Sequence, residues 1–232
     1  ASPMHEERLL ALIVWTLQME AAQKAHDEKR MQAIASAYIN NRAGINNWDL
    51  VDVSCYKILG PVIELKGKCE TPSSAPKHVV KKEKKGFTPP AAEAHLWTDE
   101  PLEVRLVTDP ATLKTGSWMP KNPWTGFGQL RGFAQSGTLW EKRIAMVTTY
   151  YFIKLGSYEP TIEMATILLS DKHDLLQKAV GWMLREMGKA DEGMLTAFLK
   201  RYHSALGRTA LRYAIEKFPE ARRQAILKGR VA

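Results

Sequence analysis

The chain has 232 residues, of which 45% are hydrophobic and 25% charged, and its formal net charge at pH 7 is +8. This composition excludes a disordered chain and fits one globular domain with a sizeable core, and it does not exclude two. The positive charge indicates a polyanionic partner, and nucleic acid is the first expectation. The apolar run LLALIVW at 9–15 is too short to span a bilayer. We therefore expect an intracellular protein with no membrane partner, cytoplasmic in a prokaryote or nuclear in a eukaryote.

Apolar residues recur at spacings of three and four along most of the chain, which predicts amphipathic helices, while the alternation typical of strands is scarce. In chain order the predicted helices cover residues 7–20, 29–40, 48–59, 141–155, 160–169, 175–187, 194–206, 208–218 and 219–227. Glycines just outside these segments and prolines in first turns are typical of helix ends. The predicted fold class is therefore all-α.

A weak repeat connects four of these helices, which open at Arg8, Arg143, Lys178 and Thr209. Each has a small residue early and apolar residues on the same face, and the last three are spaced by roughly 30 to 35 residues. Such a period is typical of helix pairs stacked into a solenoid. Ordinary amphipathic helices also produce internal similarity of this strength, so the repeat alone does not decide the architecture.

Residues 61–137 interrupt the helical pattern. They contain most of the prolines, the charge run KKEKK at 81–85 and the aperiodic stretch SWMPKNPWTGFGQLRGF at 117–133. Because long structureless stretches are uncommon in compact domains, we expect an inserted loop segment within a single domain of residues 4–232. Part of it is expected to pack, since Trp97, Trp118 and Trp124 are costly to leave in water.

Most enzyme signatures are absent from the sequence. The six histidines form no HExxH motif, and neither GxxxxGK[ST] nor GxSxG occurs. Only Cys55 and Cys69 are present, without a CxxC pair, so a zinc ribbon or a disulfide framework is not expected. We therefore expect neither a metal nor another cofactor.

Three stretches carry a specific resemblance: INNWDLVD at 45–52, LWEKRIA at 139–145 and QKAVGWMLREMGK at 177–189. They resemble the signature stretches of the DNA alkylation repair family of HEAT-like repeat proteins, which includes AlkD-like alkylpurine DNA glycosylases. RTALRYAIEKF at 208–218 is similar to the closing helices of that family. The resemblance covers most of 4–60 and 138–229. It implies a HEAT-like helical repeat solenoid with a basic concave groove for duplex DNA, and we expect a monomer.

Two departures from the family pattern affect regions outside these motifs. Family members usually begin with a further helical repeat, whereas this chain starts at what resembles the second one. The segment between the first two motifs is also far longer than the family norm. The groove is therefore expected to be shortened at one end and covered, extended or completed by the insertion.

The resemblance implies a monofunctional DNA glycosylase that excises cationic N3- or N7-alkylated purines from duplex DNA by hydrolysis. Trp48 and Trp182 would flank the sugar of the lesion, and Asp52 would stabilise the cation and position the attacking water. Arg143 would hold a phosphate, and Arg185 is a candidate for a second phosphate contact. Trp48 and Asp52 are four residues apart, so a helix places them on one face. Both the alkylated base and the departing sugar are cationic, and an indole face and a carboxylate each attract a cation.

Each of these residues also has an ordinary structural interpretation. Trp48 and Trp182 fit core aromatics, Asp52 fits a hydrogen-bonded helix carboxylate, and Arg143 and Arg185 fit partners of nearby acids. A non-catalytic HEAT-type module that binds nucleic acid or a protein is therefore the alternative function. Retention of the motif residues together favours the enzyme, and loss of the first repeat favours the module.

Overall fold

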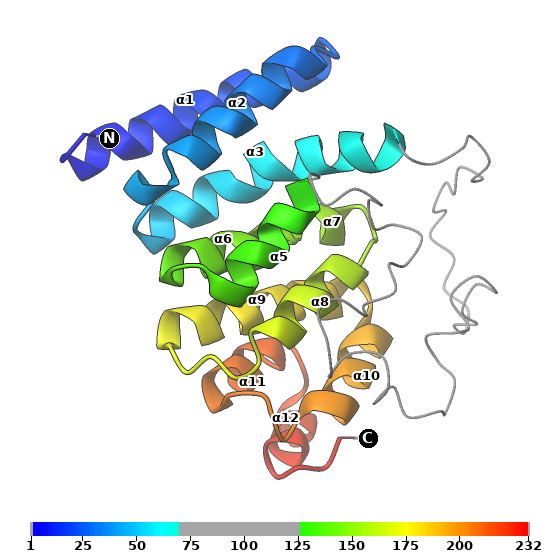
Figure 1. The fold of residues 1–232 in the computed structure, drawn as a ribbon. Helices are drawn as coiled ribbons and strands as arrows, with labels where there is room; N and C mark the ends of the chain where they lie inside the picture. The colour runs from blue at the N-terminus through cyan, green and yellow to red at the C-terminus, as the bar shows by residue number, and fades with distance from the viewer. Residues whose placement is uncertain (1, 70–125, 232) are drawn as a thin grey trace.

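The computed structural model describes residues 2–69 and 126–231, and within these ranges every regular element is helical, which confirms the predicted all-α class. The elements stack in chain order along one axis, from α1 and α2 at one end to α11 and α12 at the other (Figure 1). They are α1 (His5–Lys24), α2 (Glu28–Asn40), the short 3-10 helix η1 (Arg42–Gly44), α3 (Trp48–Cys69), α5 (Gly126–Ser136), α6 (Leu139–Thr148), α7 (Tyr150–Lys154), α8 (Glu159–Ile167), α9 (Asp174–Ala190), α10 (Glu192–Tyr202), α11 (Arg208–Ala214) and α12 (Glu220–Leu227).

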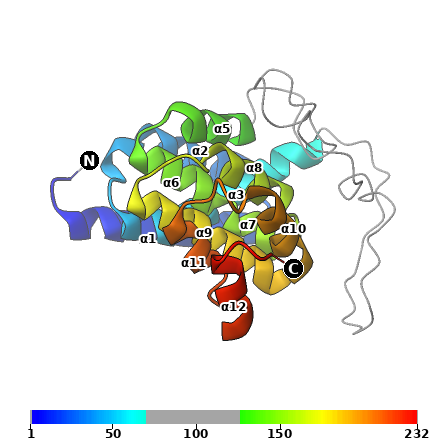
Figure 2. The ribbon, with the colours of Figure 1, turned by 90° about the horizontal axis from the view of Figure 1, so that it is seen from below.

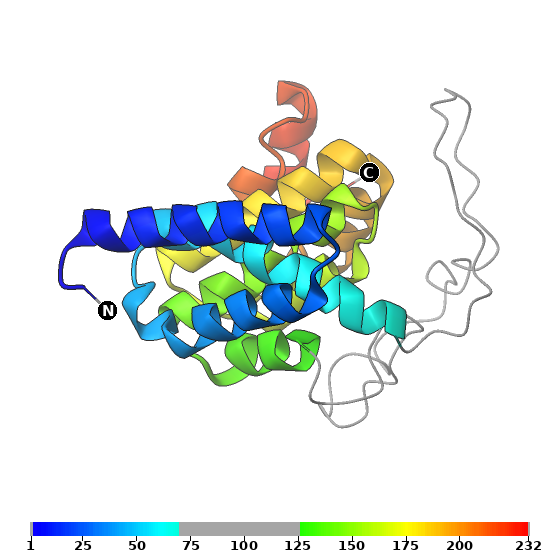
Figure 3. The same cartoon turned by 90° about the horizontal axis from the view of Figure 1, so that it is seen from above.

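The helices form two layers, which makes the stack a solenoid. In one layer α1 packs on α3, α3 on α6, α6 on α9 and α9 on α11. The other layer consists of α2, α5, α8 and α10, which pack against the first layer. There α2 contacts α3, α5 contacts α6, and α8 and α10 contact α9. Figure 2, seen along the stack, places α2, α5 and α8 on one side and α1, α9 and α11 on the other. Figure 3, seen from the opposite end, shows α1 and α2 side by side as the end pair.

The start of α6 is fixed by a capping box. The Thr138 hydroxyl accepts from the backbone N–H of Glu141 at 3.4 Å, and the Glu141 carboxylate accepts from the backbone N–H of Thr138 at 2.8 Å. Arg42 of η1 also donates to the Glu141 carboxylate, and this contact is the main reason why the pKa of that carboxyl is lowered. Residues before α3 therefore hold the helix that carries Arg143.

The sequence predicts one helix over 141–155, but the structure divides it at Thr149 into α6 and α7. Two consecutive threonines turn their hydroxyls back onto the helix: Thr148 donates to the Ile144 carbonyl and Thr149 to the Met146 carbonyl, each at 2.7 Å. Such bonds compete with the backbone ladder and bend helices. The apolar period continues across the break, so the pattern alone does not reveal it.

The segment expected as a loop over 61–137 is helical at both of its described ends. α3 continues through Pro61 to Cys69, and α5 occupies 126–136. Proline removes one helical hydrogen bond, yet Val62 and Ile63 bury their side chains directly after it, and this burial favours continuing the helix. Residues 70–125, with the KKEKK run and Trp97, Trp118 and Trp124, lie outside the described residues. In the described part, every helix falls short of the apolar length that a membrane crossing requires.

Candidate functional site

An open cleft of about 330 Å³ lies on the layer formed by α3, α6, α9 and α11. Four of the five residues singled out from the sequence line it, namely Trp48, Arg143, Trp182 and Arg185; its other lining residues are Leu175, Lys178 and Tyr213. Another hollow, of about 270 Å³ between α2, α3 and α5, is lined without any ionisable side chain and offers no charge for chemistry.

Asp52, the fifth expected residue, is bound to Arg143 at the edge of the cleft. Arg143 Nε donates to Oδ1 of Asp52 at 2.9 Å, and its terminal Nη2 donates to Oδ2 at 2.7 Å. The other terminal nitrogen donates to the Leu175 carbonyl on α9. The side chains of Arg143 and Asp52 are only 6% and 16% exposed. The structure therefore gives Arg143 a carboxylate partner, as its ordinary structural interpretation predicts, and the phosphate contact that the resemblance implies stays a prediction.

Burial changes the pKa of Asp52 more than the ion pair with Arg143 does. Removal from water raises the pKa of the carboxyl, while the hydrogen bonds and charge of Arg143 lower it, and the net shift is upward. The nearby carboxylate of Asp49 adds to the rise. A desolvated carboxylate exerts a stronger field on a neighbouring cation than an exposed one does.

The residues around Trp48 are held by α1. His5 lies 2.7 Å from the Asp49 carboxylate, and Arg8 donates to the Gly44 carbonyl at 3.1 Å and to the Asn46 side chain at 2.7 Å. Trp48 itself is 53% exposed, so it is not a core aromatic. The anchored backbone presents its indole to the cleft.

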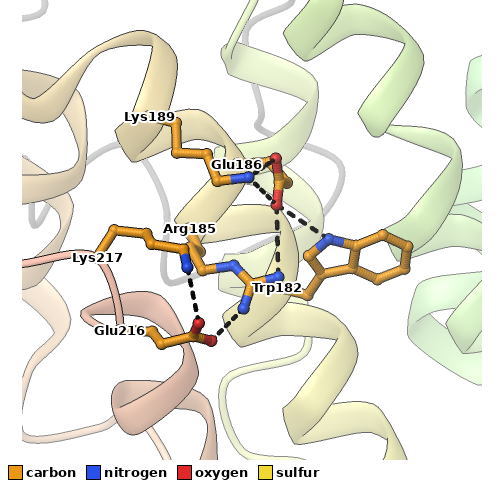
Figure 4. A network of polar contacts seen from close by, with 6 residues as sticks. All are labelled: Trp182, Arg185, Glu186, Lys189, Glu216 and Lys217. Carbon is orange, nitrogen blue, oxygen red and sulfur yellow. Dashed lines mark hydrogen bonds and ion pairs between the residues drawn. The ribbon is translucent and has the colours of Figure 1, made fainter.

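Trp182 is oriented by a network of charged residues on α9 and after α11 (Figure 4). Its indole Nε1 donates to a carboxylate oxygen of Glu186 at 3.2 Å. Lys189 donates to both oxygens of Glu186, at 2.8 and 2.6 Å. Arg185 lies 3.5 Å from Glu186 and also donates to Glu216. Arg185 thus reaches the cleft with two carboxylates beside its guanidinium.

Close packing of α9 on α11 completes the cleft wall. A Cβ atom at Gly181 would lie 2.5 Å from the carbonyl oxygen of Ala210 and 2.5 Å from the Cβ of Tyr213. Only glycine permits this approach, which brings Tyr213 to the cleft that Trp182 also lines.

An aromatic row extends from the cleft along the same layer. The ring of Tyr150 on α7 lies 6.1 Å from the indole of Trp182, and 5.1 Å from the ring of Tyr56 on α3, edge to face. Trp48, Asp52 and Tyr56 follow one another at intervals of four residues on α3. The row therefore begins on the same helical face as the expected catalytic residues.

Sequence reasoning did not single out Tyr56, Tyr150 or Glu186, although a local signal existed for each. Tyr56 continues the four-residue spacing of Asp52, Tyr150 lies seven residues after Arg143, and Glu186 four after Trp182. Tyr213 and Glu216 had no such signal, because their place at the cleft depends on how α11 packs on α9. Among the described residues, no group of three His, Cys, Asp or Glu side chains is arranged to hold a metal ion.

A family model described as DNA alkylation repair enzyme matches residues 1–84 and 126–218. The matched ranges contain the helices that form the cleft and all five residues singled out from the sequence. No curated protein and no solved structure matches the chain significantly. The match covers most of the chain, and the chain belongs to the DNA alkylation repair enzyme family.

Proposed function

We propose that this protein is a monofunctional DNA glycosylase that removes cationic N3- or N7-alkylated purines from duplex DNA by hydrolysing the glycosidic bond, and that it acts as a monomer. The observation that carries the proposal is the cleft itself. Two indoles, of Trp48 and Trp182, line an open cleft whose edge holds the desolvated Asp52–Arg143 pair, in a chain of the DNA alkylation repair family.

The chemistry requires stabilisation of positive charge more than proton transfer to the leaving group. When the bond between the sugar C1′ and the purine nitrogen breaks, the electron pair leaves with the alkylated base, which becomes neutral, and the sugar gains oxocarbenium character. Indole faces attract such a cation by about 0.5 to 2 kcal/mol. The carboxylate of Asp52 adds a preorganised negative charge and accepts a hydrogen bond from the water that attacks C1′.

Arg143 suits the role of a positioning group for this carboxylate. It uses three of the five N–H donors of a guanidinium on Asp52 and the Leu175 carbonyl, which leaves two for a neighbouring DNA phosphate. The two bonds to Asp52 fix the carboxylate plane, and its remaining lone pairs stay available for the water. Arg185 uses one N–H on Glu216 and one on Glu186, so a phosphate there would compete with the charges of two carboxylates.

The shape of the cleft supports recognition of the lesion without a closed base pocket. Enzymes that flip a base need a snug cavity around it. Here the cleft is open and Trp48 remains half exposed, so the aromatic faces meet the sugar and base edge from the groove. Charge of the lesion, rather than the outline of one base, then selects the substrate.

The test is incubation of the protein with duplex DNA that carries a single 7-methylguanine, followed by chromatography for the free base. We expect release of 7-methylguanine and an abasic strand that breaks only after alkaline treatment. The Trp48→Ala and Trp182→Ala variants, checked for folding by circular dichroism, should release it more slowly. Binding of the duplex by the folded parent without base release would instead identify a non-catalytic nucleic-acid module.

A further inference from the structure

Most cations at the cleft are neutralised by carboxylates. Arg143 is paired with Asp52, Lys178 with Asp174 at 2.6 Å, and Arg185 with Glu216. Lys189, one turn further along α9, is paired with Glu186. A cation that must first give up a carboxylate gains less from a phosphate than an unpaired one does. The arginines that the motif suggests as phosphate contacts are therefore not the strongest anion sites of this surface.

Lys154 at the end of α7 differs from these cations. Its ammonium nitrogen lies 4.7 Å from the centre of the Tyr150 ring and 5.0 Å from that of Tyr56, and its side chain is exposed. Lys57 of α3 lies 6.0 Å from the Tyr56 ring. Within the described residues neither lysine has a carboxylate at ion-pair distance. Burial is the main reason why the pKa of Tyr56 is raised; the charge of Glu20 adds to this rise, and Glu20 forms no ion pair with either lysine.

The two tyrosine rings hold the Lys154 ammonium without consuming its hydrogen-bond donors. A cation over an aromatic face is attracted by the ring quadrupole, and its three N–H groups remain free for an anion. Restriction on the rings also lowers the side-chain entropy that is lost when an anion binds. Lys154 is thus held in place, and no carboxylate of the described residues neutralises it.

The place of Lys154 relative to the cleft indicates which anion it meets. The ring of Tyr150, under Lys154, packs against the indole of Trp182, which lines the cleft. Only one aromatic ring separates the ammonium from the cleft wall. A strand whose lesion lies in the cleft carries its next phosphates within a few nucleotides, at about 3.4 Å of helix rise each.

We propose that Lys154, held on the rings of Tyr150 and Tyr56 and assisted by Lys57, binds a phosphodiester of the DNA strand beside the cleft. This inference rests on the proposed function only in taking duplex DNA as the ligand. It makes Lys154, rather than Arg185, the main phosphate anchor of the aromatic row.

The test measures affinity for an undamaged duplex over a series of salt concentrations, with Lys154→Met, Lys57→Met and Lys154→Arg. The matched control is Lys200→Met, which removes the same charge from an exposed position on α10 in the other layer. Loss of one phosphate contact should lower the slope of log affinity against log salt by about 0.9 for Lys154→Met. Lys200→Met should keep the parent slope, and Lys154→Arg should restore it. The loss should be equal for unrelated duplex sequences, because a phosphate carries no base information.

Equal slopes for the parent and Lys154→Met, or equal losses for Lys154→Met and Lys200→Met, would overturn the inference. Base release by the parent is measured separately on the 7-methylguanine duplex. A parent that binds DNA but releases no base would refute the glycosylase proposal, while the slopes would still decide the role of Lys154.

Discussion

The carboxylate of Asp52 on α3 and the guanidinium of Arg143 on α6 meet through two parallel hydrogen bonds across 91 positions of the sequence. Both side chains are nearly buried, so if one of them is removed, water cannot solvate the charge of the other. The pair joins two neighbouring helices of the stack and holds the carboxylate of Asp52, which shares a helical face with Trp48 and Tyr56, in one orientation. Its removal is thus expected to affect both structure and chemistry.

Replacement of Asp52 by Asn keeps the size of the side chain but removes its charge. Loss of one preorganised electrostatic group costs about 3 kcal/mol, or roughly 10² in rate, at the chemical step. We expect single-turnover excision of 7-methylguanine at saturating enzyme to slow by about this factor, with little change in duplex affinity. Equal rates from two folded proteins would remove Asp52 from the mechanism.

The pH dependence of excision should report the balance between burial and Arg143 at Asp52. Burial raises the pKa of this carboxyl, so activity that needs the carboxylate should be lost, as pH falls, at a higher pH than for an ordinary aspartate. Arg143 lowers the pKa, so Arg143→Gln should move this acid limb to still higher pH. The measurement is a single-turnover rate profile of both proteins; unchanged limbs would mean that another group controls the rate.

Glu186 should act on the reaction through Trp182. Glu186→Gln keeps an oxygen for the indole Nε1, whereas Glu186→Leu leaves that N–H without its partner and lets the ring turn. We expect the Leu variant to lose roughly fivefold in single-turnover rate, equivalent to about 1 kcal/mol, and the Gln variant to retain most of the rate. Lys189→Met is the control, because it removes a partner of Glu186 and leaves the indole bond intact. A similar loss in the Gln and Leu variants would point to charge instead of orientation.

Gly181 should be intolerant of even one methyl group. A Cβ there would overlap the Ala210 carbonyl, and overpacking of this kind costs about 1 to 3 kcal/mol. We expect Gly181→Ala to lower Tm by several degrees, at about 2 to 4 °C per kcal/mol for a protein of this size.

The matched control is Gly132→Ala on α5, where a Cβ meets no atom within 4 Å and φ is not in the left-handed region. There alanine should raise stability by about 0.4 to 1 kcal/mol, because it reduces the freedom of the unfolded chain. A Gly181→Ala protein as stable as the parent would show that α9 and α11 can separate without cost.

Helix type and most helix positions followed from the sequence, because burial of one helical face imposes a period of three to four residues that can be read directly. The predicted helices were wrong in two places: where glycines hid the apolar period, and where a helix broke although the period continued. In α5, Phe127, Leu130 and Ala134 are buried at helical spacing, but the three glycines of this helix made the stretch resemble a loop. At Thr149 the apolar period continues, but the helix is interrupted between α6 and α7.

Four residues that line the cleft were singled out from motifs, but the partners of their side chains were decided by the packing of the helices. Spacing along α3 determines that Trp48, Asp52 and Tyr56 share a face. It does not determine that Arg143 binds Asp52, or that Glu216 binds Arg185, since each contact joins helices distant in sequence. The strength of an ion pair depends on distances of a few ångströms and on local burial, and both are set by how the helices pack. The tertiary structure alone thus separates the paired arginines from Lys154, which has no carboxylate partner in the part of the chain that the structure describes.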